Sequence, residues 1–313
     1  MRYHTYKEGG TFINPLTDSG FKILFGRESS RDILIGFLNA IFDGDGRDPV
    51  TEVTYLDKEK PKEQGEERSV IYDLHCKTQN NRRFIVEMQN RSQSYFINRT
   101  VFYVARAITE QGCPDKWDYS FMPVYGVFIS DFTLKDSDGR VRVDAELRDM
   151  ENNKQFSDAM RLVYIQLPNF RKSSPEECEN HLEKWIYLLK NMTTMERMPF
   201  VDKIFKRVEN VARVENLSPE DRRQYERDLK FYRDYHNTID FAKSEGMAKG
   251  MAKGMAKGMA QGMAQGMAQG MAKGISRGLM IAAENMFKAG HSLPEIAAVT
   301  GLPVEELRGK LGD

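Results

Sequence analysis

Cysteine, tryptophan and net charge are all scarce in this sequence. Its 313 residues include 2 tryptophans and 3 cysteines, and the odd number and wide spacing of Cys76, Cys113 and Cys178 predict reduced thiols. No CxxC or HxxxH pair occurs, which argues against a structural zinc site. The 46 basic residues balance 46 acidic ones, so composition alone predicts no polyanionic partner, and only a local basic surface would bind one.

Long apolar runs are also missing. No stretch approaches the roughly 18 residues that a membrane-spanning helix needs. The start, MRYHTYKEGG, lacks the apolar centre of a signal peptide. We therefore expect no membrane partner and a cytoplasmic location.

Residues 1–170 contain a mixture of helical and strand patterns. The spacing of apolar residues predicts one or two amphipathic helices between residues 11 and 42, and another helix over about 94–111. A turn at Gln79-Asn80-Asn81 favours an antiparallel hairpin, and the helix at 94–111 allows a crossover to the next strand. The predicted strands are 50–57, 69–77, 83–89, 122–132 and 161–167.

The remainder of the chain is predicted to be helical. Ser-Pro-Glu sequences at 174–176 and 218–220 are typical of helix starts. The sequence therefore predicts an α/β domain with a mixed sheet flanked by helices, followed by an all-helical C-terminal region. We divide that region into a helical segment at 171–244, a glycine-rich repeat at 245–278 and a tail at 279–313.

The repeat has a strict period of four residues. A Met-Ala-Lys or Met-Ala-Gln unit recurs seven times from Met247, and each unit is followed by glycine. Because an α-helix has 3.6 residues per turn, no face of such a helix stays apolar, and each glycine costs about 1 kcal/mol relative to alanine. We interpret the repeat as a fraying helix or a flexible tether. Self-association through the glycines, or nucleic-acid contact through the lysines, are the alternatives.

The tail has the outline of a helix-turn-helix. A capping box from Ser292 to Glu295 predicts one helix, and a second follows the turn at 300–301. Recognition of DNA by the last helix is one interpretation. However, Glu305 and Glu306 in its first turn would repel phosphates, so we favour a helical interaction module.

Two carboxylates stand out among the predicted strands. Alternation places Asp73 on one face with His75 and Lys77, and places Glu87 on one face with Gln89. If the hairpin turns both faces to the same side, the two carboxylates become neighbours at one edge of the sheet. Such oxygen ligands suit Mg²⁺, which keeps several waters and substrate phosphates in its shell. The alternative is an ordinary pair of acids that face arginine or lysine.

These residues resemble a known signature. Asp73, thirteen intervening residues and Glu87-Met88-Gln89 are similar to the Asp…(Asp/Glu)-x-Lys pattern of the PD-(D/E)xK nuclease superfamily. The resemblance implies a restriction-endonuclease-like fold with a core of a helix, three strands, a helix and a strand, in agreement with the predicted order. Further segments resemble the PD-(D/E)xK nuclease family transposases, also called recombination-promoting nucleases: Asn14-Pro15, Asp18, Phe21-Lys22, Leu24-Phe25-Gly26, Tyr55-Leu56-Asp57, Tyr72, Arg99, Tyr103 and Pro123-Val124-Tyr125.

The resemblance implies a DNA endonuclease that depends on Mg²⁺, for which Mn²⁺ can substitute. Asp73 and Glu87 would be metal ligands, and Asp18 would be the third acid. At the position of the superfamily's lysine the chain has Gln89, which can orient a water but carries no charge.

Three cations are candidates to hold the phosphate. Lys77 shares a face with Asp73 but is about 13 Å along the strand, and Lys22 lies in the first predicted helix. Arg99 would either bind the phosphate or pair with Glu87 in the core.

Other residues and classes of protein stay open. His75 is a second candidate general base, although packing is the usual role of a lone strand histidine. Trp117 and Tyr119 are expected to pack with Phe121 and not to stack on bases. A catalytically inactive DNA-binding or interaction protein, or a self-associating scaffold, would keep the same fold. A homo-oligomer is compatible with the resemblance, because many nucleases pair two sites.

Overall fold

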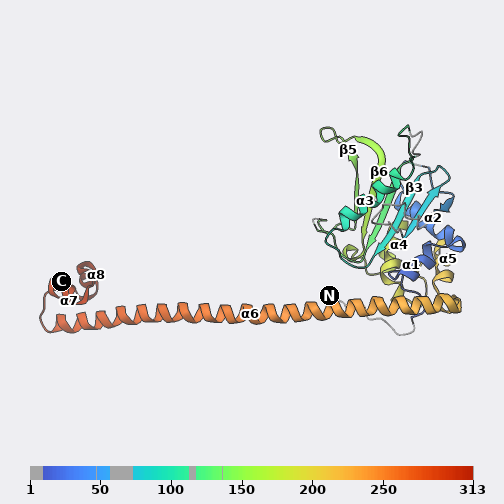
Figure 1. Ribbon diagram of the computed structural model, residues 1–313. Helices are drawn as coiled ribbons and strands as arrows, with labels where there is room; N and C mark the ends of the chain where they lie inside the picture. The colour runs from blue at the N-terminus through green and yellow to red at the C-terminus, as the bar shows by residue number, and fades with distance from the viewer. Residues whose placement is uncertain (1–9, 47, 57–72, 113–117, 136, 313) are drawn as a thin grey trace, which may run out of the picture. The chain divides into compact units, whose positions relative to one another are not determined.

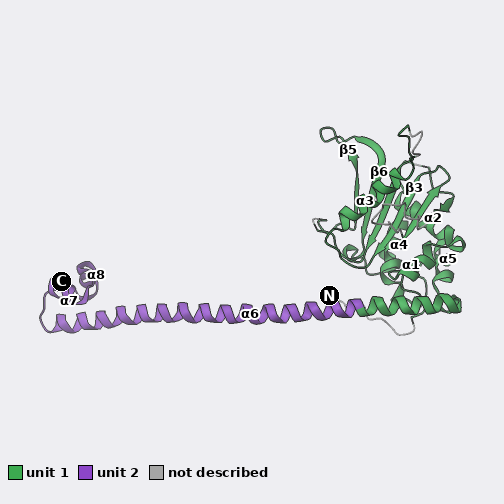
Figure 2. Cartoon of the chain, viewed as in Figure 1, with its two compact units in different colours: residues 1–234 green, residues 235–313 purple. Residues whose placement is uncertain are grey.

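The computed structural model describes residues 10–312, except 47, 57–72, 113–117 and 136 (Figure 1). Cys113, Trp117 and the first part of the strand predicted at 69–77 lie outside the described residues. The chain divides into two compact units, residues 1–234 and 235–313 (Figure 2).

The first unit is built on a mixed six-stranded sheet with strand order β1-β2-β3-β4-β6-β5. The β1, β2 and β3 strands are antiparallel neighbours, as predicted for the hairpin, and β3, β4 and β6 run parallel. The α3 helix (Phe96–Thr109) makes the predicted crossover between β3 and β4. The strands are β1 (Val53–Tyr55), β2 (Leu74–Thr78), β3 (Arg83–Gln89), β4 (Val124–Ser130), β5 (Arg142–Arg148) and β6 (Gln155–Gln166).

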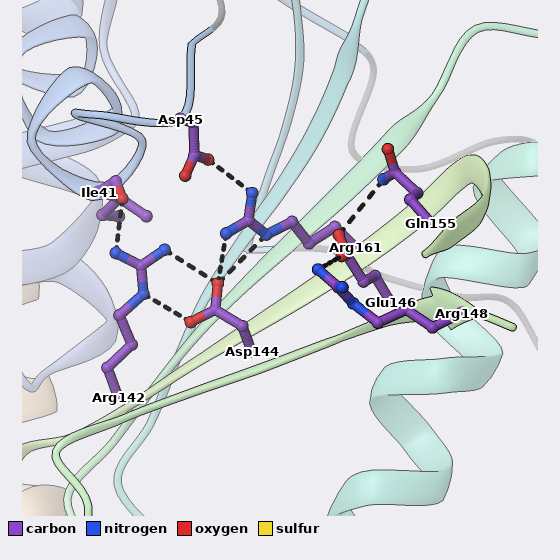
Figure 3. Close-up of polar contacts among 8 residues, drawn as sticks. All are labelled: Ile41, Asp45, Arg142, Asp144, Glu146, Arg148, Gln155 and Arg161. Atoms are coloured by element: carbon purple, nitrogen blue, oxygen red, sulfur yellow. Dashed lines mark hydrogen bonds and ion pairs between the residues drawn. The ribbon is translucent and has the colours of Figure 1, made fainter. Parts of the chain in front are cut away.

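The β5 strand was not predicted, and β6 begins earlier than expected. Charged residues at every second position of β5 alternate with the apolar Val143, Ala145 and Leu147, which is the period-two pattern of a strand, so β5 could have been predicted from the sequence. Charge pairs also tie it to β6 (Figure 3). Asp144 accepts hydrogen bonds from Arg142 at 2.7 Å and from Arg161 of β6 at 2.8 Å. Arg161 also donates to Asp45 at 2.5 Å, which ties β6 to the segment after α2.

Helices cover both faces of the sheet. On one face, α1, α2, α4 and α5 enclose the main core, where Phe25, Phe37, Trp185 and Phe205 are fully buried. On the other face, α3 packs over a smaller core that includes Ile85. The helices are α1 (Asp18–Phe25), α2 (Arg31–Ile41), α4 (His181–Asn191) and α5 (Lys203–Ala212), with 3-10 turns η1 (Glu28–Ser30), η2 (Leu167–Asn169), η3 (Pro175–Glu177), η4 (Met192–Thr194) and η5 (Val214–Asn216).

The α6 helix (Pro219–Lys288) is continuous over 70 residues. Its first turns, up to residue 234, belong to the first unit, and Tyr225 and Tyr232 are buried there in the main core. Through the repeat every side chain is exposed, and a Cβ added at any glycine from Gly246 to Gly278 would meet no described atom within 4 Å. The repeat is therefore helical, while its service as a tether stays a prediction.

The tail forms the predicted helices α7 (Leu293–Thr300) and α8 (Val304–Leu311). They pack with the end of α6 around three buried residues, Ala283, Ile296 and Leu307. The predicted capping box joins Ser292 and Glu295. In the described parts of the chain, no helix is both long enough and apolar enough to cross a membrane.

Candidate active site

The β2–β3 hairpin brings Asp73 and Glu87 together. In its register Leu74 lies opposite Val86 and His75 opposite Ile85, so the next pair outward is Asp73 and Glu87. Residues directly opposite in an antiparallel pair share a face, as the sequence predicts for these carboxylates. Ile85 belongs to the core beneath α3, and Glu87 lies on the same side of β3. The pair therefore faces α3.

Both carboxyl groups are held in an environment that disfavours their charge. Glu87 is 4% exposed, and its Oε1 atom makes no hydrogen bond with any described residue. Burial raises the pKa of Glu87 to about 8, with a further rise from Asp73 and an opposing effect of Arg99. Burial also raises the pKa of Asp73, although a 3.1 Å hydrogen bond from the Met88 N–H to Asp73 Oδ2 opposes the rise. Two such carboxylates need a cation beside them to ionise together.

Asp18 borders the pair from the start of α1. Thr17 caps that helix, and its hydroxyl accepts a 3.1 Å hydrogen bond from the Gly20 N–H. The charge of Asp18 adds to the effect of burial in raising the pKa of Asp73. Asp18 is itself paired with Lys22 at 2.6 Å, and its side chain is 55% exposed. It lies at the solvent side of the site, and Lys22 lies there with it.

Arg99 reaches the site from α3. Its Nη2 atom donates a 2.6 Å hydrogen bond to Gln89 Oε1 and lies 3.8 Å from Glu87 Oε2. Gln89 uses its other end too, because its Nε2 donates to the Arg91 carbonyl at 3.0 Å. The Nη1 atom of Arg99 donates to Gln93 Oε1 at 2.6 Å. Gln89, which occupies the lysine position of the signature, is therefore hydrogen-bonded to Arg99, the arginine predicted to bind phosphate.

Three other candidates from the sequence have different surroundings. Lys77 lies opposite Arg83 near the turn of the hairpin, four residues or about 13 Å along the strand from Asp73, as the sequence indicated, and its role at the phosphate stays a prediction. Tyr119 was expected to pack, but it is 77% exposed, since the apolar cores formed without it. His75 is buried on β2 opposite Ile85, as a packed strand histidine would be.

Sequence reasoning missed two contributions to the site. Gln93 lies in the loop before α3, where periodicity carries no information about side-chain contacts. The first turns of α6 supply the second contribution. Asp228 accepts a hydrogen bond from the Ser19 N–H, and Tyr232 donates to Asp131, whose N–H donates to the Gln89 carbonyl at 3.0 Å. The sequence predicted only that this segment is helical, and not which residues it contacts.

The residues present fit a hard divalent cation. Mg²⁺ takes oxygen ligands and often binds through only one or two carboxylates, and the buried Oε1 of Glu87 is an acceptor without a donor. A group of three or more acidic, histidine or cysteine side chains placed to hold a metal ion is absent from the described residues, in line with the pairing of Asp18 with Lys22. Among the described residues, Asp73 and Glu87 are the pair of carboxylates best placed to hold the ion.

Comparisons with known proteins agree with this geometry. No match was found among curated proteins or among solved structures. The family model described as PD-(D/E)XK nuclease family transposase matches residues 15–242, which include the sheet, α1 to α5, the first turns of α6 and all the site residues named above. This match covers well over half of the chain, and the mixed sheet flanked by helices is consistent with a restriction-endonuclease-like fold. The chain belongs to the PD-(D/E)XK nuclease family transposases.

Proposed function

We propose that the protein is a Mg²⁺-dependent DNA endonuclease, with Mn²⁺ able to replace Mg²⁺. The observation that carries the proposal is the buried carboxylate of Glu87, which has an oxygen without a donor and lies opposite Asp73. Burying a carboxylate in this way is costly unless a cation compensates it. In a family of nuclease-type enzymes, that cost is best explained by a metal site.

In this proposal Asp73 and Glu87 hold the ion, and Asp18 is the third acid at the solvent side. When bound, the ion would polarise the phosphate and lower the pKa of a coordinated water. In the hydrolysis, the water oxygen bonds to phosphorus while one P–O ester bond breaks. The products are a phosphate monoester and a hydroxyl. Arg99 steadies the negative charge that develops on the phosphate, and Lys22, whose charge acts on Asp73, is a second candidate cation.

The family description names both a nuclease and a transposase, and of the two reactions, cleavage and strand transfer, we propose only cleavage. Strand transfer would also require a second DNA end to be held, and we assign no described residue to that task. A homo-oligomer and a cytoplasmic location remain predictions.

The second candidate is a catalytically inactive DNA-binding or interaction protein that retains the fold. Gln89 at the lysine position favours it, because an amide supplies no charge. An inactive descendant has no need of a metal site, so binding of Mn²⁺ measured by titration calorimetry separates the two. Binding that is lost in both Asp73→Ala and Glu87→Ala favours the enzyme.

Cleavage of supercoiled and linear DNA in Mg²⁺, Mn²⁺ or EDTA tests the proposal directly. We expect the intact chain to cut in either metal, and Asp73→Ala and Glu87→Ala to lose this activity. Asp158→Ala removes an exposed carboxylate of β6 and serves as the matched control. Equal cutting by all four proteins would assign the activity to another site or to contamination. Absence of cutting with DNA binding retained would favour the inactive protein.

A further inference from the structure

Two glutamines accept hydrogen bonds from the guanidinium group of Arg99. Gln89 at the end of β3 accepts from Nη2, and Gln93 in the following loop accepts from Nη1, each at 2.6 Å. The rings of Phe96 and Tyr103 each have their centroid 5.6 Å from the Arg99 Cζ atom. These contacts restrict the rotamers of a long side chain, so the group is positioned before any substrate binds.

The acceptors are amides, and this choice matters. A carboxylate at either position would neutralise the guanidinium, whereas an amide oxygen orients it and leaves its charge in place. Glu87 forms an ion pair with Arg99 at 3.8 Å, which is longer than a hydrogen bond, and Asp73 interacts with the guanidinium through its charge. The Arg99 side chain keeps 27% of its surface exposed. Its charge is therefore available to a phosphate that approaches the carboxylate pair.

The amide of Gln89 is occupied at both ends. Its oxygen accepts from Arg99, and its nitrogen donates to the Arg91 carbonyl at 3.0 Å. An amide that is held in this way has a fixed orientation, and the group it faces is the guanidinium. This geometry gives Gln89 a role that differs from direct positioning of a water.

We infer that Gln89 and Gln93 are positioning residues for Arg99, and that the positive charge acting on the phosphate comes from α3 and not from β3. The inference rests on the proposed function. It assigns a role to Gln93, and it makes Gln89 act through Arg99. The loss of a charged residue at position 89 is then compensated by a cation brought to the same place by another element.

A double-mutant cycle tests the inference. Gln89→Ala, Gln93→Ala, Arg99→Ala and the doubles with Arg99→Ala are compared by kcat in Mg²⁺ and by Kd for a short duplex in Ca²⁺. We expect Arg99→Ala to lower kcat by about 100-fold, and each double to lose no more than about twofold beyond it. If Gln89 acted on the water directly, the fold-losses in kcat of Gln89→Ala and Arg99→Ala would multiply in the double variant. Such multiplied losses would overturn the inference.

Moving the charge gives a second test. A lysine at position 89 would place its ammonium group where Gln89 now meets Arg99, so Gln89→Lys in the Arg99→Ala background should recover about tenfold or more of the lost kcat. Arg99→Lys should retain more activity than Arg99→Ala. Gln79→Ala is the matched control, because Gln79 also uses both ends of its amide but lies near the turn of the hairpin. Absence of recovery in the charge-swap variant would contradict the inference.

The two proposals fail in different ways. If the intact chain cuts no DNA in any metal, the nuclease proposal fails, but the cycle in Kd still reports on Arg99. Arg99→Ala should then weaken DNA binding and lower the slope of log Kd against log salt by about one, with no further loss in the doubles. Independent losses in Kd would reject the positioning role even in that case.

Discussion

The carboxylate of Asp228 on α6 accepts a hydrogen bond from the Ser19 N–H, 3.1 Å away, in the first turn of the helix that carries Asp18. A helix N-terminus has unsatisfied N–H groups and a positive partial charge, and Asp228 supplies an acceptor from more than two hundred residues further along the chain. Through this contact α6 helps to hold the helix that carries Asp18 in place.

Replacing this cap should destabilise the first unit. We expect Asp228→Ala to lower the free energy of unfolding by about 1 kcal/mol, because the Ser19 N–H loses its acceptor. Urea denaturation followed by tryptophan fluorescence measures the change. Asp240→Ala, on the exposed part of the same helix, is the control and should behave as the unchanged chain. Equal stability of both variants would show that Asp228 does not support α1.

Glu87 should make the fold less stable as pH rises. Its pKa is about 8 in the folded chain against an ordinary value of 4.5, so between these values the folded state binds more protons than the unfolded state. Stability therefore falls from about pH 5 to pH 8. Glu87→Gln should remove this decline and raise Tm at pH 8 in EDTA, although it abolishes metal-dependent cutting.

Melting curves at pH 5, 6.5 and 8 test this sign. The control is Glu151→Gln, which changes an exposed glutamate of the β5–β6 loop. A Glu87→Gln variant that melts below the unchanged chain at pH 8 would mean that the ionised carboxylate is compensated within the fold.

Metal affinity should depend on pH for the same reason. The ion competes with the proton on Glu87, so the apparent affinity should rise with pH and level off near pH 8. Below that value we expect about one proton to be released per ion and about a tenfold change in affinity per pH unit. Calorimetry with Mn²⁺ in buffers of different ionisation enthalpy counts the protons. A constant affinity between pH 6 and 8 would place the ion elsewhere.

The position of a C-terminal truncation should decide whether the first unit folds. A chain that ends at residue 245 keeps Tyr225 and Tyr232, which are buried in the main core of the first unit, and should fold and cut DNA. A chain that ends at residue 217 loses both and should be unstable. Circular dichroism and light scattering compare the two with the full chain. Fewer chains per particle after removal of 246–313, with the particle mass divided by the mass of the shortened chain, would support the self-associating scaffold.

Alanine in place of repeat glycines should strengthen α6. At Gly254 and Gly258 an added Cβ meets no described atom within 4 Å, so each change should stabilise the helix by about 1 kcal/mol through propensity alone. Helical ellipticity during thermal melting measures this effect. A fall in particle mass in the same variants would show instead that the glycines contact a second copy of the chain.

Local patterns predicted the elements that form the site. The β3 strand spans Arg83–Gln89 as predicted, and the alternation along it placed Glu87 and Gln89 on one face. The hairpin turn then determined the pairing with Asp73. These features depend on neighbours within a few residues, which is why periodicity and turn chemistry suffice.

The other contacts depend on tertiary packing. Gln93 lies in a loop, so no period ties it to Arg99, and the partner of Asp228 is in another part of the chain. The α5 and α4 helices were predicted as helices, but their packing against α1 and α2 required the structure.

The charged pattern of β5 also affects whether the sheets of two chains can pair edge to edge. β5 is an outer strand of the sheet, and its outer row of backbone groups is a potential template for another strand. Charged side chains occupy every second position along it, namely Arg142, Asp144, Glu146 and Arg148 (Figure 3). The register of its pairing with β6 shifts on either side of Leu147. A strand from another chain that paired with β5 would have to bury these charged side chains and follow an irregular edge. The sheet is thereby protected from growing across chains at β5, and edge-to-edge aggregation is opposed there by the same ion pairs that hold the strand within one chain.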